Sequence, residues 1–397
     1  MNPPSDRAFA WFSLCIATWF AAWGIQLVMF SWLIVGPLDA GAQWLGLAQT
    51  STTLPALALV LFGGAAADRV DPRRLIAGVH ALAVLPVLAL GLAVGAGWLS
   101  LAGLGAYGVA IGTLSAFGMP ARDALLSRVA GSDLMRAVTT LTAVQFGAQS
   151  AGTLAAATAR WWGPLPVLAL QALLLLTGAF AVRRIVTGSA PARAPGRSSA
   201  LRDIGDGLAV VAASPNLRTP LTMVLAVSFL FIGPFNVAMP LLVRDVYAGG
   251  ASEIALVFTC FPLGTIAGSL VLRARGLRRK GLAVLTSLAL CCAAMAAMGL
   301  GFPLPVLMTT TFAWGLGGAV FINASRTLYQ AAAPTDRRAR VMAVYQLAFL
   351  GGVPLGSLAG GLVSAAVGPE RLLLGASACM LVVVAGIGLG TGMARME

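Results

Sequence analysis

The most constraining feature of this sequence is a series of long apolar segments that recurs from one end to the other. A helix needs about 20 mainly apolar residues to cross the hydrocarbon layer of a bilayer. Such segments occur in two groups of six, separated by one polar stretch. They lie near residues 9–36, 43–66, 75–97, 100–121, 137–158 and 163–182, and then near 219–243, 253–273, 281–300, 303–325, 341–366 and 370–392.

These segments predict an all-α membrane protein with twelve transmembrane helices. We expect an N-terminal six-helix bundle at 1–182, a cytoplasmic linker at 183–218 and a C-terminal six-helix bundle at 219–397. Composition agrees, because 59% of the residues are apolar and only 10% are charged. A soluble protein carries about 25% charged residues, so this composition excludes a water-soluble enzyme or nucleic-acid binder.

The basic residues predict the orientation of the helices. Cytoplasmic loops of membrane proteins carry an excess of Lys and Arg. With both termini in the cytoplasm, all but three of the 26 basic residues lie on that side, and the exceptions are Arg160, Arg244 and Arg371. We therefore expect a multi-pass protein of the bacterial inner membrane with cytoplasmic termini.

The linker contains a predicted amphipathic helix. Leu201, Ile204, Leu208 and Val211 recur at helical spacing, with charged residues on the opposite face. Such a helix lies at the membrane surface. Two interpretations stay open: a strap that couples the two bundles, and a tether that keeps the linker on the bilayer.

An internal repeat supports the division into two bundles. A shift of 204 residues superposes several residues in corresponding inner loops and in the helices that follow them. The pairs are Gly64 and Gly268, Arg69 and Arg273, Arg74 and Arg278, Arg122 and Arg326, and Arg136 and Arg340. Two parallel six-helix repeats around an axis along the membrane normal are the architecture of major facilitator transporters, which bind substrate near the midplane.

The loop at 64–74 resembles the major facilitator signature Gly-x-x-x-Asp-Arg-x-Gly-Arg-Arg, with Asp71-Pro72 where the usual Gly and the residue after it stand. Gly64 is expected to permit close helix contact, and Asp68 to offer its carboxylate to Arg73 and to a helix N-terminus. Such a charged latch would hold an inner gate shut. The predicted gating residues are Gly64, Asp68, Arg69, Arg73, Arg74, Arg122, Asp123 and Arg326.

Three stretches resemble one branch of the superfamily, the enterobactin-exporter-like facilitators or transmembrane secretion effectors. They are 44–47 with the loop just described, 116–126 with its Pro-Ala-Arg sequence, and 201–218. The resemblance implies secondary active export of siderophores, drugs or other amphiphilic metabolites, usually against a proton gradient. This chain lacks the acidic residue that relatives often carry near Trp23-Gly24.

Polar and aromatic side chains inside the predicted helices are the candidate cargo-binding residues, because polar groups in hydrocarbon are costly and usually functional. The resemblance places helices 1, 4, 7 and 10 around the central cavity. The alternatives are lipid contact or packing for the aromatic residues, and interhelical hydrogen bonds for the glutamines. The candidates are Trp19, Trp23, Gln26, Phe30, Gln145, Gln149, Asn236, Trp314, Asn323 and Tyr345.

The charged residues restrict the cargo. None of the 13 carboxylates falls in the middle of a predicted span, so a hydrophobic cation is a poor candidate and a neutral or anionic amphiphile is preferred. A proton-coupled mechanism, such as an antiporter, would have to use carboxylates at the membrane borders. Asp68 and Asp123 lie at the inner border, and Asp245 and Glu253 at the outer one.

No cofactor or metal site is predicted. The five cysteines lie in apolar segments without ligand spacing, His80 is the only histidine, and no nucleotide-binding P-loop is present. We expect a monomeric exporter in the lipid bilayer that binds a small amphiphile and no nucleic acid. A lipid or lysophospholipid flippase of the same fold, and a membrane sensor that binds without transport, remain alternatives. An intramembrane enzyme is disfavoured, because no clustered catalytic residues lie at midplane depth.

Overall fold

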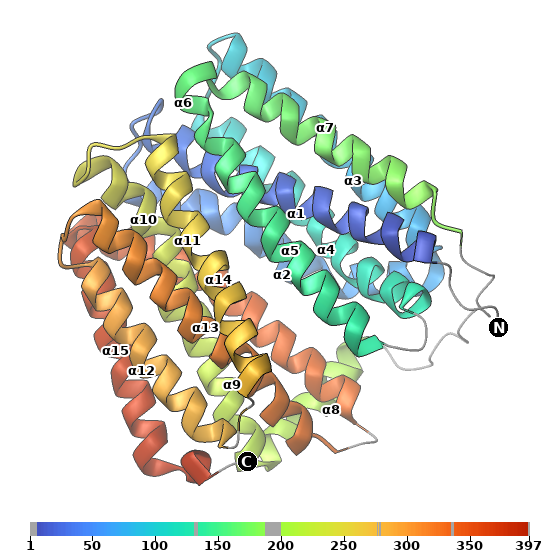
Figure 1. The fold of residues 1–397 in the computed structure, drawn as a ribbon, viewed down its shortest axis with the longest axis vertical. Helices are drawn as coiled ribbons and strands as arrows, with labels where there is room; N and C mark the ends of the chain where they lie inside the picture. The colour runs from blue at the N-terminus through green and yellow to red at the C-terminus, as the bar shows by residue number, and fades with distance from the viewer. Residues whose placement is uncertain are drawn as a thin grey trace. The chain divides into compact units, whose positions relative to one another are not determined.

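A computed structural model describes residues 6–130, 134–186, 200–275, 277, 279–334 and 337–395. The central part of the predicted linker, 187–199, lies outside the described residues. Every regular element among the described residues is helical (Figure 1). In the first part of the chain these are α1 (Asp6–Val35), α2 (Ala42–Arg69), α3 (Pro72–Gly95), α4 (Leu101–Val129), α5 (Leu134–Ala157), α6 (Ala159–Trp162) and α7 (Pro164–Arg183).

The remaining elements begin inside the predicted linker, with α8, and include one π-helical segment. They are α8 (Ala200–Ala213), α9 (Pro215–Val227), the π-helix η1 (Ser228–Ile232), α10 (Gly233–Asp245), α11 (Ala251–Arg275), α12 (Lys280–Met298), α13 (Leu304–Ala332), α14 (Arg338–Val367), α15 (Pro369–Gly390) and the short 3-10 helix η2 (Gly392–Arg395).

Eleven spans in the described residues are long and apolar enough to cross a membrane. One of them, Pro215–Asp245, is a continuous helix made of α9, η1 and α10. The remaining predicted segment, 137–158, corresponds to α5, a helix of 24 residues that is not among the eleven. The many threonines and glutamines of α5 lower its hydropathy below that of its neighbours.

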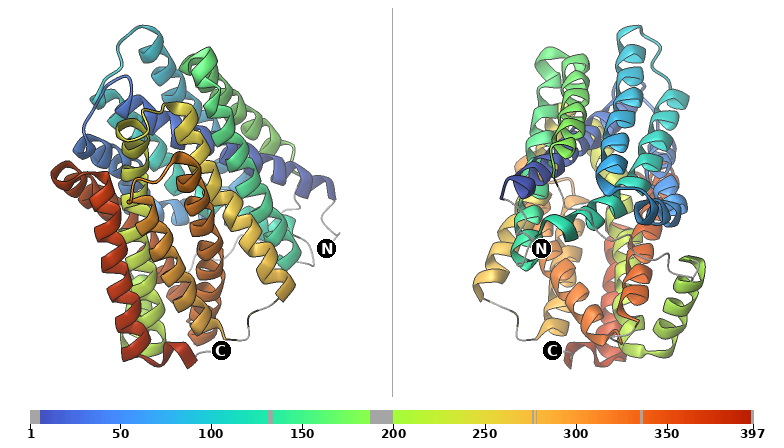
Figure 2. Two further views of the ribbon diagram at one scale, coloured as in Figure 1. Left: turned by 60° about the vertical axis from the view of Figure 1, so that its left-hand side comes forward. Right: turned by 90° about the vertical axis from the view of Figure 1, so that its right-hand side faces the viewer.

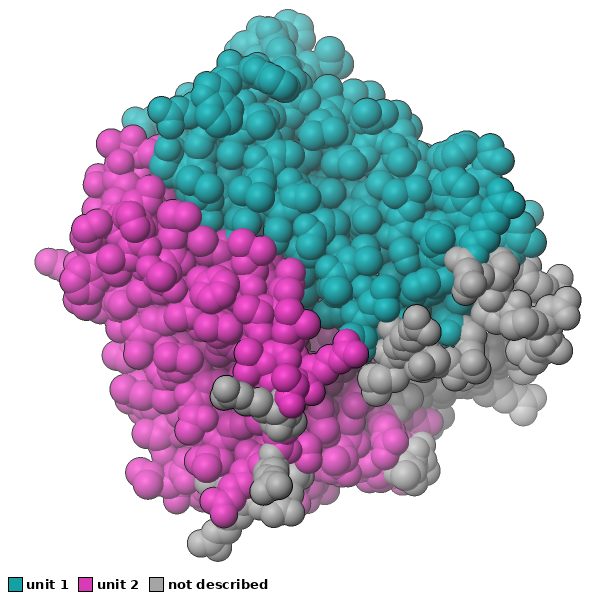
Figure 3. All heavy atoms as spheres, in the orientation of Figure 1, with its two compact units in different colours: residues 1–39, 51–197, 250–259 teal, residues 40–50, 198–249, 260–397 magenta. Residues whose placement is uncertain are grey.

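The chain divides into two units, which Figure 3 distinguishes by colour. Unit 1 comprises 1–39, 51–197 and 250–259, and unit 2 comprises 40–50, 198–249 and 260–397. Within unit 1, α1 packs against α5 and α7, and α3 packs against α7 and α4 (Figure 1). Within unit 2, α12 packs between α13 and α15, and α14 lies against α10 and α8 (Figure 2). The helices α2 and α11 are each divided between the units, with one end in unit 1 and the other end in unit 2.

Glycines bring helix backbones into direct contact in both units. In unit 1, Gly63 of α2 lies against the backbone carbonyl of Ala116 in α4, so even a methyl group there would overlap that carbonyl. In unit 2, a Cβ atom on Gly46 would lie 2.8 Å from the Cα of Gly361. Small residues at such crossings are the usual means of helix association in membranes.

The close contact predicted for Gly64 belongs instead to its neighbour. A Cβ atom on Gly64 would meet nothing within 4 Å, whereas Gly63 faces Ala116. One residue along a helix turns the side-chain direction by about 100°, so only one of two adjacent glycines can face a given neighbour. The signature glycine at 64 therefore makes no helix contact in this structure.

The amphipathic helix predicted in the linker is α8, and it is fixed to α14 inside unit 2. The guanidinium of Arg340 donates to the carboxylate of Asp206 at 3.0 Å. One residue on, a Cβ atom on Gly207 would lie 2.7 Å from the backbone oxygen of Arg340. Val211 is buried, and Leu208 is half exposed. A helix held by an ion pair and by backbone contact is an integral part of unit 2.

The adjacent glycines of α2 provide a test of backbone packing. We expect Gly63→Ala to lower the free energy of unfolding by about 1–3 kcal/mol, because overpacking displaces α4 from α2. Gly64→Ala, which meets open space, should leave stability unchanged or slightly raised. Thermal unfolding of the purified protein in detergent measures both. Equal melting temperatures for the two variants would contradict the packing described here.

Candidate functional site

Four of the predicted cargo-binding residues, Trp19, Trp23, Gln26 and Phe30, are spaced at i, i+4, i+7 and i+11 and share one face of α1. Trp19, Gln26 and Phe30 are buried, and Trp23 is 38% exposed. The Trp19 ring lies 5.0 Å from the ring of His80 in α3, measured between centroids. The face thus consists of three side chains packed inside a helix bundle and one that remains accessible.

A small cavity of about 20 Å³ lies between α1, α3, α4 and α7. A volume of this size holds about one water molecule. Three predicted cargo-binding residues, Trp19, Trp23 and Gln26, are part of its wall, and every lining residue is uncharged. The lining residues are Trp19, Ala22, Trp23, Gln26, Ala83, Ile111, Ser115, Gln171 and Leu175.

Gln171 of α7 is a polar residue of this cavity that our sequence analysis missed. Its Nε2 atom donates to the hydroxyl of Tyr107 at 3.1 Å, and the Tyr107 ring stacks on Phe30 at 5.8 Å. Its Oε1 atom is buried and accepts no hydrogen bond from the described residues. The signal was present in the sequence, because Gln171 is the only amide side chain in α7 and lies within an apolar run.

Arg122 of α4 lies against two aromatic rings of α1. Its guanidinium carbon is 5.0 Å from the centroid of the Trp19 ring and 5.3 Å from that of Phe20. Its Nε donates to the backbone oxygen of Gly118 at 3.2 Å, and its Nη1 is buried without a partner among the described residues. Cation–π contacts stabilise a partly desolvated guanidinium by about 1–2 kcal/mol. A positive charge is thereby held beside a ring that lines the cavity.

His80 is held inside the same bundle by its backbone. Its Nδ1 lies 3.0 Å from the carbonyl oxygen of Ile76, which can only accept, so this nitrogen carries the proton. The Nε2 then faces the thiol of Cys15, with 3.8 Å between nitrogen and sulfur. Gly178 of α7 leaves room for the ring, since a Cβ there would lie 2.6 Å from Nε2. This geometry gives the buried histidine a hydrogen-bond partner in the backbone of its own helix.

The two glutamines of α5 occupy different environments. Gln149 is buried where Gly24 of α1 approaches its backbone carbonyl, and Gln145 is partly exposed. Neither amide side chain forms a hydrogen bond within the described ranges. On the same helix, the hydroxyl of Thr153 lies 2.8 Å from that of Thr259.

In unit 2, Trp314 is the centre of an aromatic cluster. The ring of Phe235 in α10 lies 4.6 Å away, that of Phe261 in α11 4.8 Å, and that of Phe231 in η1 6.0 Å. Phe231 belongs to the π-helix, an element that often occurs at functional sites. The partly buried Asn236 follows Phe235 directly.

The other predicted residues of unit 2 have local partners. Asn323 is exposed, and its amide donates to the carbonyl of Ala319 in its own helix at 2.8 Å. Tyr345 is buried, and its hydroxyl lies 3.1 Å from that of Ser325. The Tyr345 ring packs against Tyr329 at 5.1 Å. Trp314 and Tyr345 therefore belong to separate contact clusters.

The ion pair expected between Asp68 and Arg73 is formed by a different carboxylate. Asp71 binds Arg73 with 2.7 Å between oxygen and Nη2, and it also accepts from the Arg73 backbone N–H at 2.9 Å. It is therefore the N-cap of α3, and Pro72 follows at the first helical position, where a missing N–H is tolerated. The Asp71-Pro72 departure from the signature thus has a structural explanation.

Apart from Gly64 and Arg122, the other predicted gating residues are exposed. The Asp68 carboxylate has no ion pair or hydrogen bond to any described residue. Asp123 and Arg326 are exposed at the ends of α4 and α13. A gating role of Asp68 consequently stays a prediction. The predicted ion pair between Asp68 and Arg73 is wrong, because Arg73 pairs with Asp71.

The Asp71 ion pair gives a pH-dependent prediction. The Arg73 guanidinium holds the pKa of the Asp71 carboxyl below its ordinary value of 3.8. A depressed pKa stabilises the fold above the unfolded-state pKa, and this contribution is lost as pH falls through the folded-state pKa. We expect Asp71→Asn to lower the melting temperature at pH 7 and to have little effect below about pH 3.

The control for this experiment is Asp68→Asn, which removes a nearby carboxylate, in the last turn of α2, that has no partner among the described residues. It should leave the melting temperature unchanged at both pH values. A stability difference between wild type and Asp71→Asn that persists undiminished at pH 3 would show that the ion pair is not responsible.

Comparison with known proteins identifies the family. Residues 1–396 match the family model described as transmembrane secretion effector. The multidrug efflux pump Tap of Mycolicibacterium fortuitum is 28% identical over 384 residues, which cover 90% of this chain and 89% of that protein.

Solved structures with low sequence identity share the fold. The nucleoside transporter NupG superposes with a TM-score of 0.77 at 12% identity, over 100% of both chains. A bacterial homologue of the human lysosomal transporter Spinster, in an inward-facing and occupied conformation, gives a TM-score of 0.75 at 14% identity over 100% of this chain and 98% of the other. The chain therefore belongs to the transmembrane secretion effector family of major facilitator transporters.

Proposed function

We propose that this protein exports a neutral or anionic amphiphilic small molecule from the cytoplasm by alternating access. Its setting is the bacterial inner membrane, with both termini in the cytoplasm, as the distribution of arginines favours. Export is supported by the match to the efflux pump Tap along most of both chains.

The observation that carries the cargo class is the uncharged aromatic and amide wall of the cavity in unit 1. Indole rings and amides suit stacking and weak hydrogen bonding to an amphiphile. The orphan Oε1 of Gln171 offers an acceptor to a hydroxyl or N–H group of the cargo. Gating motions would have to enlarge the cavity, because its present volume of about 20 Å³ is too small for a metabolite.

Arg122 sets the preferred charge of the cargo. Its guanidinium lies next to Trp19, which lines the cavity, and none of the lining residues is a carboxylate. A cation near the cavity attracts anionic groups and repels cationic ones. Because no carboxylate lines the cavity, any coupled proton has to be carried by carboxylates at the membrane borders. Asp68 and Asp123 are the candidates at the inner border.

Transport in proteoliposomes tests the proposal. Three amphiphiles with one scaffold and a neutral, an anionic or a cationic headgroup are offered with and without a pH gradient. We expect flux of the neutral and anionic compounds and little flux of the cationic one. Binding without flux under every gradient would make the protein a sensor, and movement of phospholipid alone would make it a flippase; either result overturns the proposal.

The accessible tryptophan of the cavity gives a second prediction. We expect Trp23→Ala to raise the KM for a transported compound about tenfold, because the loss of one aromatic contact costs about 1.4 kcal/mol of binding free energy. The matched control is Trp98→Ala, which removes an 80% exposed indole outside the cavity. Equal KM values for the two variants would exclude this face of α1 from the cargo path.

A further inference from the structure

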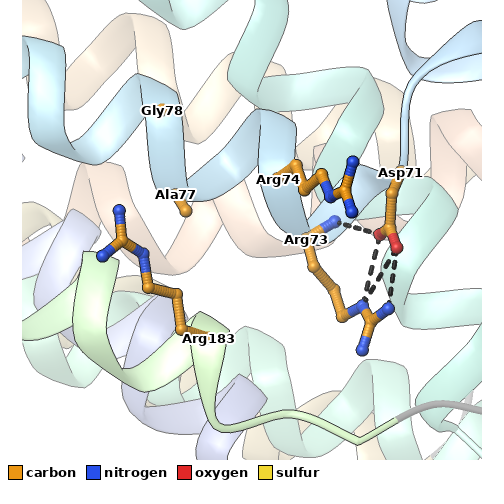
Figure 4. A pocket seen from close by; sticks show the side chains of 6 residues that line it. All are labelled: Asp71, Arg73, Arg74, Ala77, Gly78 and Arg183. Atoms are coloured by element: carbon orange, nitrogen blue, oxygen red, sulfur yellow. Dashed lines mark hydrogen bonds and ion pairs between the residues drawn. The ribbon is translucent and has the colours of Figure 1, made fainter.

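A hollow outside the cargo cavity lies where α3 begins and α7 ends in unit 1. Its volume is about 330 Å³. Three arginines and one carboxylate surround it, as Figure 4 shows. The lining residues are Asp71, Arg73, Arg74, Ala77, Gly78 and Arg183.

One of the three arginines is already neutralised. The Arg73 side chain donates to both oxygens of Asp71, with distances from 2.7 to 3.3 Å. Its Nη1 also donates to the backbone oxygen of Ile185, just beyond the end of α7, at 3.0 Å. Arg73 therefore acts as a strut that fixes the end of α7 to the start of α3.

The other two arginines supply uncompensated charge. Neither Arg74 of α3 nor Arg183 of α7 forms an ion pair or hydrogen bond with any residue in the described ranges. They come from two different helices, and in Figure 4 the Arg74 guanidinium lies on the Asp71 side of the hollow while the Arg183 guanidinium lies on the opposite side. Two guanidinium groups that flank one hollow suit an anion with several oxygens, and Arg binds phosphate through paired N–H donors.

Small residues line the hollow between these two arginines. Ala77 is buried, and a Cβ atom on Gly78 would meet nothing within 4 Å. A ligand can therefore approach the backbone of α3 between the two guanidinium groups.

Apolar side chains continue from the hollow along both helices. On α3, the exposed Leu82 and Leu85 follow Gly78 at positions i+4 and i+7. On α7, the exposed Phe180 and Leu176 precede Arg183 by three and seven residues. Because α3 and α7 pack side by side (Figure 1), exposed apolar side chains of two neighbouring helices lead away from the charged hollow, and we call them the apolar track.

We propose that this hollow binds the phosphate headgroup of an anionic phospholipid, with its acyl chains along α3 and α7. The hollow lies at the ends of two candidate spans, Pro72–Gly95 and Pro164–Arg183, where headgroups are found. With the orientation given above it faces the cytoplasmic leaflet, and basic pockets between helices on that side bind anionic headgroups. The apolar track favours a lipid over a soluble phosphate.

The test uses the full-length protein in neutral detergent. Its melting temperature is measured with dioleoylphosphatidylglycerol, with dioleoylphosphatidylcholine and with inorganic phosphate, each at the same concentration. A ligand that binds the folded state raises the melting temperature. We expect the phosphatidylglycerol to raise it by about 2 °C or more, and the other two compounds to have little effect.

Two double variants separate this site from general charge. Arg74→Gln with Arg183→Gln should abolish the phosphatidylglycerol shift. Arg7→Gln with Arg69→Gln removes the same charge from other helix ends of unit 1, the start of α1 and the end of α2, outside the hollow, and should retain it. A shift that survives in the first pair, or that disappears equally from both pairs, would overturn the proposal.

A third variant tests the shape of the hollow without changing its charge. Gly78→Leu places a side chain between the guanidinium groups and should also remove the shift, which keeps the proposal testable if the double variant does not fold. An unchanged shift in Gly78→Leu would refute a bound headgroup in the hollow. If inorganic phosphate raised the melting temperature of the wild-type protein as much as phosphatidylglycerol does, a lipid ligand would be refuted.

Discussion

Direct contact between helix backbones is the interaction on which both units depend. Lipid tails are as apolar as leucine side chains, so burial of leucine provides little drive for helices to associate in a bilayer. The chain compensates with 47 glycines, several of which face a neighbouring carbonyl. Gly63 against Ala116 and Gly24 against Gln149 are examples in unit 1. Where these glycines lie determines which faces of α1, α2 and α4 point inward, and hence which side chains line the cavity.

Much of the fold could be predicted from the sequence, because spanning length is a property of a whole segment. The predicted apolar segments correspond to helices, and the predicted amphipathic helix of the linker corresponds to α8. Precise contacts were less accessible. The signature suggested Gly64 as the packing glycine, yet Gly63 makes the contact, because a one-residue step changes the direction of a helical side chain by more than a quarter turn. A motif indicates that a loop matters, but the packing of the neighbouring helix decides which residue touches it.

The sequence indicated which kinds of residue form the candidate site, but not which side chains they contact. Spacing along α1 places Trp19, Trp23, Gln26 and Phe30 on one face, and all of them except Trp23 are buried. The partners of that face come from distant segments: His80, Tyr107 and Arg122 lie on α3 and α4, and no local pattern reports such pairings. Charge posed the same difficulty. Arg73 had two carboxylates within reach in the sequence, and Asp71 was favoured because it also caps α3.

The π-helix at Ser228–Ile232 has a consequence for how its span is compared with others. A π-helical turn contains about one more residue than an α-helical turn. Residues after Ile232 are therefore rotated relative to those before Ser228, by comparison with an uninterrupted helix. A helical wheel drawn through the whole of 215–245 would assign Phe235 and Asn236 to the wrong sector. Alignments of this span with relatives that lack the extra residue need a single-residue gap here. Without the gap, every later residue would be aligned with one that points to a different face of the helix.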